Sequence, residues 1–313
     1  MPYKLSFDDD IEKARPLAYV DGGEFDKTIL SLVEESHKNQ KDLDKNELAI
    51  LIENLHRSMH GSVSFQMLEQ LKNAIQDKRR PANRELGVHY DHALKIMSNN
   101  KSREVVLNDG KIVPMFDTTM DRQVMMVGGM SGSGKSYYTA QLCRTYKKQF
   151  PENKIILFSN KPSDPAFDIL SYVERVVIDE DLLVEPIGLE ELRNTLVIFD
   201  DVEYTSNKEM DKELDRIRDL ILQQGRSFKT SFVYVSHQFN NYRQTRTILN
   251  ECHCITFFPA TATKYSMKYL FDKYFGFDRK TVDKLMRLPS RWVTIYKSPP
   301  LAMYDSGCYL IDS

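Results

Sequence analysis

Residues 123–136 read QVMMVGGMSGSGKS, an apolar run that passes directly into a glycine-rich loop. The loop matches the pattern G-x-x-x-x-G-K-S/T, in which small residues let successive backbone N–H groups converge on the phosphates of a nucleotide. We expect a strand over 123–127 and a helix from about 135 to 149, whose positive dipole end points at the same phosphates. The predicted nucleotide-contacting residues are Gly129, Met130, Ser131, Gly132, Ser133, Gly134, Lys135, Ser136 and Tyr137.

Two side chains of this loop and one acid further along the chain carry predicted chemistry. Lys135 should reach the β- and γ-phosphates of ATP, and the Ser136 hydroxyl should coordinate Mg²⁺, which prefers hard oxygen ligands. The apolar run TLVIFD at 195–200 places Asp200 at a strand tip as the second Mg²⁺ ligand. Asp201 follows as the predicted catalytic base that polarises the attacking water. Glu203 competes for that role, and both acids could instead cap the next helix.

Polar residues after the run SFVYVS at 231–236 suggest a sensor of the γ-phosphate. The amide of Gln238 can donate and accept at once, so we predict it as that sensor, whereas His237 is interpreted as a structural residue. Arg226, Arg243 and Arg246 are candidates for a guanidinium that reaches the phosphates of a neighbouring subunit, and the others of the three would contact solvent or DNA. Arg226 is the first choice for a catalytic role.

The chain from 105 onward alternates between strand and helix patterns. Apolar runs at 154–159, 175–179, 195–200, 231–236 and 254–258 predict buried strands, and 207–224 has helical periodicity. This alternation predicts an α/β fold with a mostly parallel central sheet covered on both faces. Runs at 291–297 and 307–312 predict an antiparallel pair at the C-terminal edge of the sheet. We therefore predict a P-loop ATPase domain over 105–313, of the additional-strand, catalytic-acid type.

The first 104 residues are predicted to form a helical N-terminal region. Apolar residues recur at helical spacing in 25–35, 47–55 and 63–75, and a basic loop follows at 76–84. Between the two regions, Asn108-Asp109-Gly110 separates two β-rich runs, which predicts a hairpin over 105–115.

Composition and charge limit the classes of function. The 313 residues contain no apolar run of about 18 residues, the N-terminus lacks an apolar leader, and four cysteines make no disulfide framework, so a reducing intracellular compartment is expected. The net charge of −2 is unevenly spread: 164–220 carries 17 acids against 6 bases, and 225–300 carries 13 bases against 4 acids. The basic segment could face a polyanion.

Within the basic segment, individual cations are candidate DNA contacts. They are Lys264, Lys268, Lys273 and Lys284, interleaved with Tyr265, Tyr269 and Tyr274, which we interpret as helix core. Lys78, Arg79, Arg80 and Arg84 form a second candidate contact.

The motifs together resemble a known family. GGMSGSGKS, VIFDDVE, QGRSFKTSFVYVSHQ and RTILN, in that order and spacing, resemble the genome-packaging ATPases of large double-stranded DNA viruses, the poxvirus type within the FtsK–HerA group of P-loop motors. The resemblance covers roughly 105–312, and in it Lys135, Asp200 and Gln238 match the family's phosphate-loop lysine, metal acid and sensor glutamine. Two features depart from the pattern. The Asp-Glu of cellular relatives is Asp200-Asp201, and Arg246 and Asn250 match a later Arg and Asn only loosely.

The resemblance implies a ring-forming motor that uses ATP and Mg²⁺ to pull double-stranded DNA, independently of sequence, into a capsid. Its implied partners are duplex DNA, further copies of itself, and a viral capsid or membrane-associated vertex component. Its implied location is the assembly site of the infected cell and the virion. The alternatives are a P-loop kinase of small molecules, a DNA helicase or non-packaging translocase, and a nucleotide-dependent switch. Intact Lys135, Ser136, Asp200 and Asp201 rank the switch last, and Gln238 after the paired acids favours hydrolysis over transfer.

Overall fold

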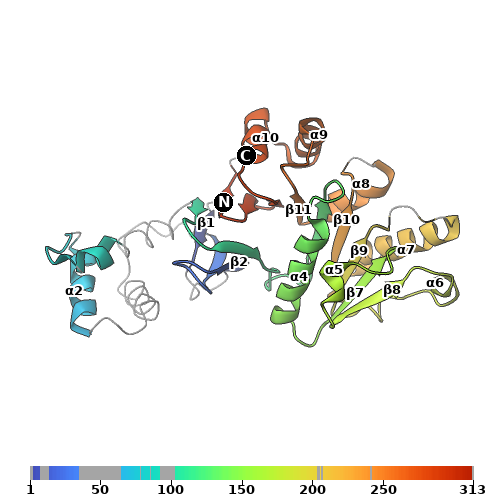
Figure 1. Cartoon of the computed structure of the whole chain (residues 1–313), viewed down its shortest axis with the longest axis horizontal. Coiled ribbons are helices and arrows are strands. Elements are labelled where there is room, and N and C mark those ends of the chain that lie inside the picture. Colours follow the sequence, from blue (N-terminus) through green and yellow to red (C-terminus); the bar gives the residue numbers. More distant parts are fainter. Residues whose placement is uncertain are drawn as a thin grey trace.

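A computed structural model describes residues 3–7, 14–34, 65–77, 79–84, 86–91, 103–202, 205, 207–239 and 242–311. Its centre is a ten-stranded sheet in the order β4-β14-β13-β12-β11-β6-β10-β9-β7-β8 (Figure 1). Its parallel strands are β6 (Val124–Gly128), β7 (Lys154–Ser159), β8 (Val173–Val177), β9 (Thr195–Asp200), β10 (Ser231–Ser236) and β11 (Cys254–Phe257). The predicted α/β fold with a mostly parallel sheet is therefore confirmed.

The antiparallel edge of the sheet has more strands than expected. It contains β12 (Val293–Lys297), β13 (Pro300–Tyr304), β14 (Gly307–Leu310) and β4 (Glu104–Val106). The predicted strands β12 and β14 both exist, but they do not pair with each other, because β13 lies between them. Pro300 is the first residue of that strand, a position at which proline removes no essential hydrogen bond.

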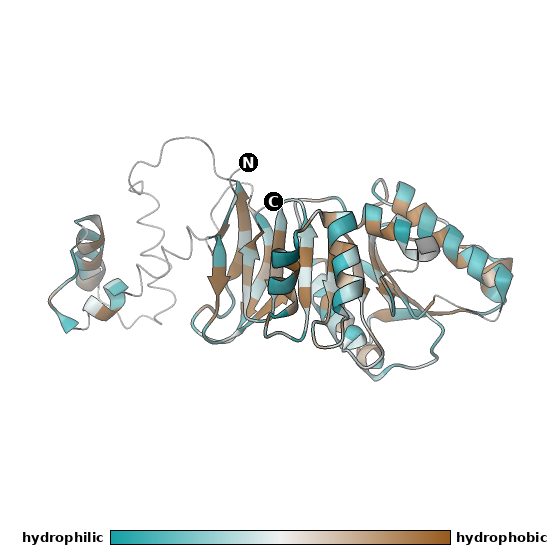
Figure 2. Cartoon of the chain, turned by 90° about the horizontal axis from the view of Figure 1, so that it is seen from above, coloured by the Kyte–Doolittle hydropathy of each residue, from teal (hydrophilic) through white to brown (hydrophobic). Residues whose placement is uncertain are grey.

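Helices cover both faces of the sheet. One face carries α7 (Lys208–Gln224), α8 (Tyr242–Glu251), α9 (Lys264–Phe275) and α10 (Arg279–Met286). The other carries α4 (Lys135–Gln149) and α5 (Pro165–Asp168), while the short α6 (Asp181–Val184) contacts α7. Every residue of β9 and β10 is buried, as a parallel strand with two covered faces requires. Figure 2 shows these apolar strands between helices with polar outer surfaces.

The N-terminal region contains strands where helices were expected. β1 (Tyr3–Ser6), β2 (Arg15–Asp21) and β3 (Ile29–Glu34) join β5 (Lys111–Pro114) in a four-stranded antiparallel sheet, ordered β1-β3-β2-β5. The predicted helix over 25–35 is therefore wrong. Its apolar residues also fit a strand buried on both faces, and a turn in which Lys27 adopts φ 65° pairs this strand with β2.

The other N-terminal predictions have different outcomes. The helix expected over 63–75 is confirmed as α2 (Phe65–Gln76), whereas the helix expected over 47–55 lies outside the described residues. Lys78 of the basic loop also lies outside them. Arg80 in that loop forms an ion pair with Asp91 at 2.7 Å, so part of its charge is already neutralised.

The hairpin predicted over 105–115 is wrong, although both of its strands exist. β4 pairs with β14 of the large sheet, and β5 pairs with β2 of the small sheet, so the turn between them connects two sheets. Gly110 has φ 77°, as the Asp-Gly turn requires. The turn packs against the β2–β3 connection, where Asp109 Oδ1 accepts a hydrogen bond from the backbone N of Glu24 at 3.2 Å. This contact with a distant part of the chain separates the two strands.

Candidate nucleotide and catalytic site

The phosphate loop connects the end of β6 to the start of α4. Gly132 and Gly134 have φ 74° and 106°, in the left-handed region that other residues rarely adopt, and Gly134 is the N-cap of α4. Gly129 is required for a different reason. A Cβ there would lie 2.7 Å from Ser133 Oγ and 2.9 Å from Phe258 Cδ2. Close packing and backbone conformation together explain the glycines of the sequence motif.

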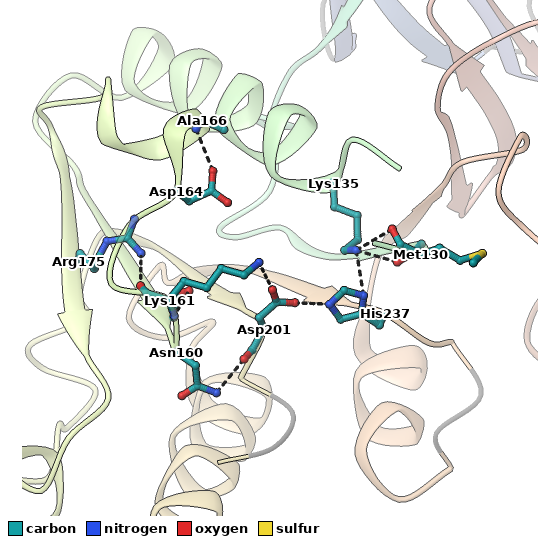
Figure 3. Close-up of polar contacts among 11 residues, drawn as sticks. Met130, Lys135, Asn160, Lys161, Asp164, Ala166, Arg175, Asp201 and His237 are labelled. Carbon is teal, nitrogen blue, oxygen red and sulfur yellow. Dashed lines mark hydrogen bonds and ion pairs between the residues drawn. The ribbon is translucent and has the colours of Figure 1, made fainter. Parts of the chain in front are cut away.

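Lys135 lies over this loop and is almost fully buried. Its Nζ donates hydrogen bonds to the carbonyl oxygens of Gly129 at 2.8 Å and Met130 at 3.1 Å, and lies 3.3 Å from Nδ1 of His237 (Figure 3). These three acceptors are neutral, so the contacts leave the ammonium charge available for an anion. Phosphate oxygens can therefore replace these carbonyls as its partners.

Asp200 is the terminal residue of β9 and is 1% exposed. Neither of its carboxylate oxygens accepts a hydrogen bond from any residue that the structure describes. Burial, followed by the charge of Asp201, raises the pKa of Asp200 to about 6. A buried carboxylate without a donor is stabilised by a cation. With the hydroxyl of Ser136 in the same cavity, this donor set fits Mg²⁺, which binds oxygen ligands.

Asp201 differs from Asp200 because both of its carboxylate oxygens face cationic or donor groups. Oδ2 forms an ion pair with Lys161 Nζ, and Oδ1 lies 2.6 Å from His237 Nε2. Burial alone would raise the pKa of Asp201, but the hydrogen bond and charge of Lys161, with His237, outweigh it and lower that pKa. Asp201 has φ 56°, and its backbone oxygen accepts a hydrogen bond from Asn160 Nδ2 at 2.9 Å. It is therefore a firmly held anion at neutral pH.

His237 joins Asp201 to Lys135. An ammonium group can only donate, so Nδ1 of His237 is the acceptor toward Lys135, and the ring proton lies on Nε2, the nitrogen that is 2.6 Å from Asp201 Oδ1. The contacts run continuously from Lys161 through Asp201 and His237 to Lys135 (Figure 3).

Sequence reasoning gave His237 a structural role and did not name Lys161. Both could have been found from strand order. Asp201 and His237 follow directly after β9 and β10, and Lys161 lies two residues after the end of β7; the three strands are neighbours in the sheet. The carboxyl ends of parallel strands meet at one edge, where ligands bind in sheets of this kind.

One cavity of about 570 Å³ collects these groups, a volume within the usual range for small-molecule sites. Its lining residues come from the phosphate loop, the end of β9, the segment after β7 and the outer face of α4. They are Ser131, Gly132, Gly134, Lys135, Ser136, Tyr137, Arg144, Lys161, Asp164, Pro165, Ala166, Ile169, Asp200, Asp201 and His237. Six of the nine predicted loop residues thus lie together with the predicted metal acid and the predicted base, whereas Gly129, Met130 and Ser133 do not line the cavity.

Other predicted site residues lie elsewhere. Gln238 is exposed and does not line the cavity, and its backbone N donates to Ser236 Oγ at 3.0 Å. The Arg226 side chain is 79% exposed and forms an ion pair with Asp121 at 3.1 Å. Arg226 precedes β10, so it lies at the amino end of the strands, opposite the phosphate loop. Arg246 is exposed on α8. Glu203 and the side chain of Arg243 lie outside the described residues.

The interpretation of the three tyrosines as helix core is wrong for two of them. Tyr265 and Tyr269 of α9 are 83% and 43% exposed, whereas Tyr274 packs against the hydrophobic core. The core-facing positions of α9 belong instead to Met267, Leu270 and Phe271. These three apolar residues already fill the buried face of the helix, so the first two tyrosines are left on its outer face.

The strand β6, the glycine loop, helix α4 and the acid at the tip of β9 define the fold of a P-loop NTPase. The chain belongs to the family of the uncharacterized protein V3 of Sputnik virophage. It is 35% identical to V3 over 213 residues, which cover 67% of this chain and 85% of V3. No protein-family model matches the chain. Among the helices of the described residues, none has the length and apolar character needed to cross a membrane.

Two solved structures illustrate what the chain is similar to. One is the genome packaging NTPase B204 of Sulfolobus turreted icosahedral virus 2 in complex with AMPPCP, at 14% identity and a TM-score of 0.42 over 59% of this chain and 98% of B204. The other is the cytoplasmic domain of the type VII secretion ATPase EccC of Thermomonospora curvata. It has 14% identity and a TM-score of 0.43 over 67% of this chain and 29% of EccC.

Proposed function

We propose that the chain is an ATP-hydrolysing motor that moves double-stranded DNA and packages a viral genome into a capsid. The observation that carries the ATPase part is the convergence of Lys135, Asp200 and Asp201 on one cavity. A phosphate loop beside a buried carboxylate that accepts no hydrogen bond from the described residues is the arrangement that a metal-bound triphosphate completes.

In the proposed reaction, the chain positions the triphosphate and prepares water to attack it. Lys135 exchanges the carbonyls of Gly129 and Met130 for phosphate oxygens. Ser136 and Asp200 would hold Mg²⁺, which when bound neutralises charge on the β- and γ-phosphates. Asp201 takes the proton of the attacking water. Because its low pKa makes it a weak base while both oxygens are engaged, this role requires release from Lys161 or His237.

The same contacts suggest how nucleotide binding could prepare the base. When Lys135 turns to the phosphates, Nδ1 of His237 loses the ammonium group that it faces. The imidazole is then free to rotate away from Asp201. One oxygen of Asp201 becomes available to water, while Lys161 keeps the other in place. His237 thus acts as a positioning residue, because the orientation of its imidazole depends on whether Lys135 contacts a phosphate.

DNA translocation is supported by charge, motif and family. The segment 225–300 carries 13 bases against 4 acids, as sequence-independent contacts with DNA phosphates require. The motif order resembles packaging motors, and the relative V3 comes from a virophage. We propose further copies of the chain as ring partners, a capsid or vertex component as docking partner, and the infected cell's assembly site as location.

A ring would also explain the position of Arg226. β10 separates it from the carboxyl edge of its own sheet, and a strand of six residues spans about 20 Å. Arg226 therefore lies far from its own phosphate loop but, at 79% exposure, could reach the site of a neighbouring subunit. Gln238 would become a sensor only if its exposed side chain turned toward the cavity on binding.

The decisive test is steady-state ATP hydrolysis with and without long duplex DNA, over a range of protein concentrations. We expect turnover that requires Mg²⁺, rises with duplex DNA and rises with protein concentration as rings assemble. Turnover indifferent to both DNA and concentration would contradict the motor. A phosphorylated small-molecule product would identify a kinase instead, and separation of strands in a labelled duplex would identify a helicase.

A further inference from the structure

Helix α9 presents an outer face that the ATPase cycle described above does not use. Tyr265 and Tyr269 lie one turn apart and are 83% and 43% exposed, with the exposed Lys268 between them. Residues at these spacings share one face of a helix. Two large exposed aromatic rings beside a lysine are unusual on a surface without a partner, because their apolar area remains in contact with water unless a partner covers it.

The charges around this face leave it positive. The acids of α9 and α10 are already paired: Asp272 with Lys273 at 3.2 Å, and Asp283 with Lys264 at 3.6 Å. Lys268 has no acidic partner among the described residues. Its charge is therefore uncompensated within the described part of the chain and exposed on the helix face that carries the two tyrosines, which suits an anionic partner that also offers hydrogen-bond acceptors.

The start of α9 is mechanically connected to the phosphate loop. Phe258 follows β11 and is 3% exposed, and its ring lies 2.9 Å and 3.6 Å from where Cβ atoms of Gly129 and Gly134 would stand. The carbonyl of Phe258 accepts hydrogen bonds from the backbone N of Thr261 and of Ala262, each at 3.0 Å. This turn leads directly to Thr263, the N-cap of α9. A shift of the loop around a nucleotide would therefore move Phe258 and, through a rigid turn, α9.

We propose that the face of α9 formed by Lys264, Tyr265, Lys268 and Tyr269 binds the phosphate backbone of duplex DNA, and that Phe258 couples this contact to the phosphate loop. The proposal rests on the proposed function. Lys268 neutralises a phosphate, and the tyrosine hydroxyls donate hydrogen bonds to phosphate oxygens, contacts that carry no sequence preference. Lys264 exchanges its carboxylate partner, which is 3.6 Å away, for a phosphate.

The binding test compares full-length chains by fluorescence anisotropy with a labelled blunt duplex. We expect the triple variant Tyr265→Ala, Lys268→Glu, Tyr269→Ala to lose at least about tenfold in affinity, and Lys268→Ala alone to reduce the salt dependence by about one phosphate contact. The matched control is Lys154→Glu. Lys154 is an exposed lysine at the amino end of β7, on the opposite sheet edge, and its change alters net charge equally. Equal losses in the control and the triple variant would overturn the proposal.

A comparison that keeps the aromatic rings but removes their hydroxyls separates duplex phosphate contact from base stacking. Tyr265→Phe with Tyr269→Phe should weaken duplex binding severalfold, because the rings remain but the donors are lost. The proposed phosphate contact is wrong if the phenylalanine variants bind duplex as the wild type does while the alanine variants do not. It is also wrong if this face binds single-stranded DNA more tightly than duplex.

Turnover distinguishes this proposal from the proposed function. If wild-type hydrolysis does not respond to duplex DNA, the motor itself fails. If it responds and the triple variant responds equally, only the α9 contact fails. For the coupling, Phe258→Leu keeps an apolar side chain under the loop. We expect unchanged duplex affinity with at least about threefold less stimulation of turnover, and unaltered stimulation would overturn the coupling.

Discussion

The two edges of the parallel sheet differ in whether key polar groups find hydrogen-bond partners within the chain. At the carboxyl edge, Asp200 is buried without a hydrogen-bond donor among the described residues, and Gly132, Gly134 and Asp201 adopt left-handed backbone conformations. At the amino edge, Arg122 donates to the carbonyl oxygens of Ile221 and Leu222, the latter at 2.7 Å, and satisfies the end of α7. The Asp200 carboxylate at the carboxyl edge can therefore still accept a partner, whereas the Arg122 guanidinium at the amino edge is already hydrogen-bonded within the chain.

This difference separates function from stability. A buried charge or a strained backbone lowers the stability of the chain by itself, and a ligand that supplies the missing partner offsets the loss. A charge that is paired within the chain instead stabilises the fold. Substitutions at the carboxyl edge should therefore impair turnover while costing little stability or even increasing it, and substitutions at the amino edge should do the reverse.

The largest expected effect comes from Lys135→Ala. Loss of the ammonium group should lower ATP turnover by about 10²- to 10³-fold, because a preorganised cation at the phosphates has no substitute in the cavity at the same position. The thermal midpoint should change little. Lys148→Ala is the matched control on the same helix, since Lys148 lies over the ring of Tyr19 at 5.0 Å and away from the cavity. If Lys135→Ala turned over ATP within a few-fold of the wild-type rate, the carboxyl edge would not be the catalytic site.

Asp200→Asn should both lower Mg²⁺-dependent turnover and stabilise the chain at neutral pH. The pKa of Asp200 is raised to about 6, so between about pH 4 and pH 6 the folded chain holds a proton that the unfolded chain has released. Wild-type stability therefore falls as pH rises through this window, and the full cost persists above it. Asparagine avoids the cost, for a gain of about 3 kcal/mol at pH 7.5 that vanishes near pH 4.

Urea denaturation of both chains at pH 4.5 and pH 7.5, without nucleotide or metal, measures this difference. Lower stability of the asparagine variant at pH 7.5 would mean that Asp200 is paired within the chain after all. Addition of Mg²⁺ with a non-hydrolysable ATP analogue should then stabilise the wild type more than Asp200→Asn, since only the carboxylate can bind the metal strongly.

The sequence predicted the buried part of the fold almost to the residue, because covered parallel strands are uninterrupted apolar runs. The expected bounds of β7, β9, β10 and α4 agree with the structure. Local pattern was insufficient where two structures fit it equally. ILSLVE suits a helix or a buried strand, and its pairing with β2 decides the outcome in favour of a strand.

The candidate site follows the same rule. Lys135 and Ser136 belong to one contiguous loop, so their position beside the phosphates could be predicted from the motif alone. The contacts of Lys161 with Asp201 and of Asp201 with His237 join residues about 40 positions apart in sequence. They depend on β7, β9 and β10 being neighbours in the sheet, and no local pattern in the sequence specifies that order.

A smaller effect is expected from Arg122→Ala at the amino edge. Two charge-assisted hydrogen bonds to the last carbonyls of α7 are lost, and the guanidinium is partly buried, so the free energy of unfolding should fall by about 2 kcal/mol. ATP turnover per folded molecule should remain within about twofold of the wild type. Thermal denaturation and turnover of the same preparation test both statements. A loss of turnover with unchanged stability would reverse the assignment of the two edges.

Arg226→Ala should have the smallest effect on folding of these four substitutions. Arg226 shares the amino edge with Arg122, but its ion pair with Asp121 joins side chains that are 79% and 50% exposed. Exposed pairs contribute little, so the thermal midpoint should shift by less than about 2 °C. If Arg226 nevertheless serves a neighbour's phosphates, mixing the variant into wild-type protein should lower turnover by more than the fraction mixed in. A strictly proportional decrease, or none, would make Arg226 an ordinary surface residue of the amino edge.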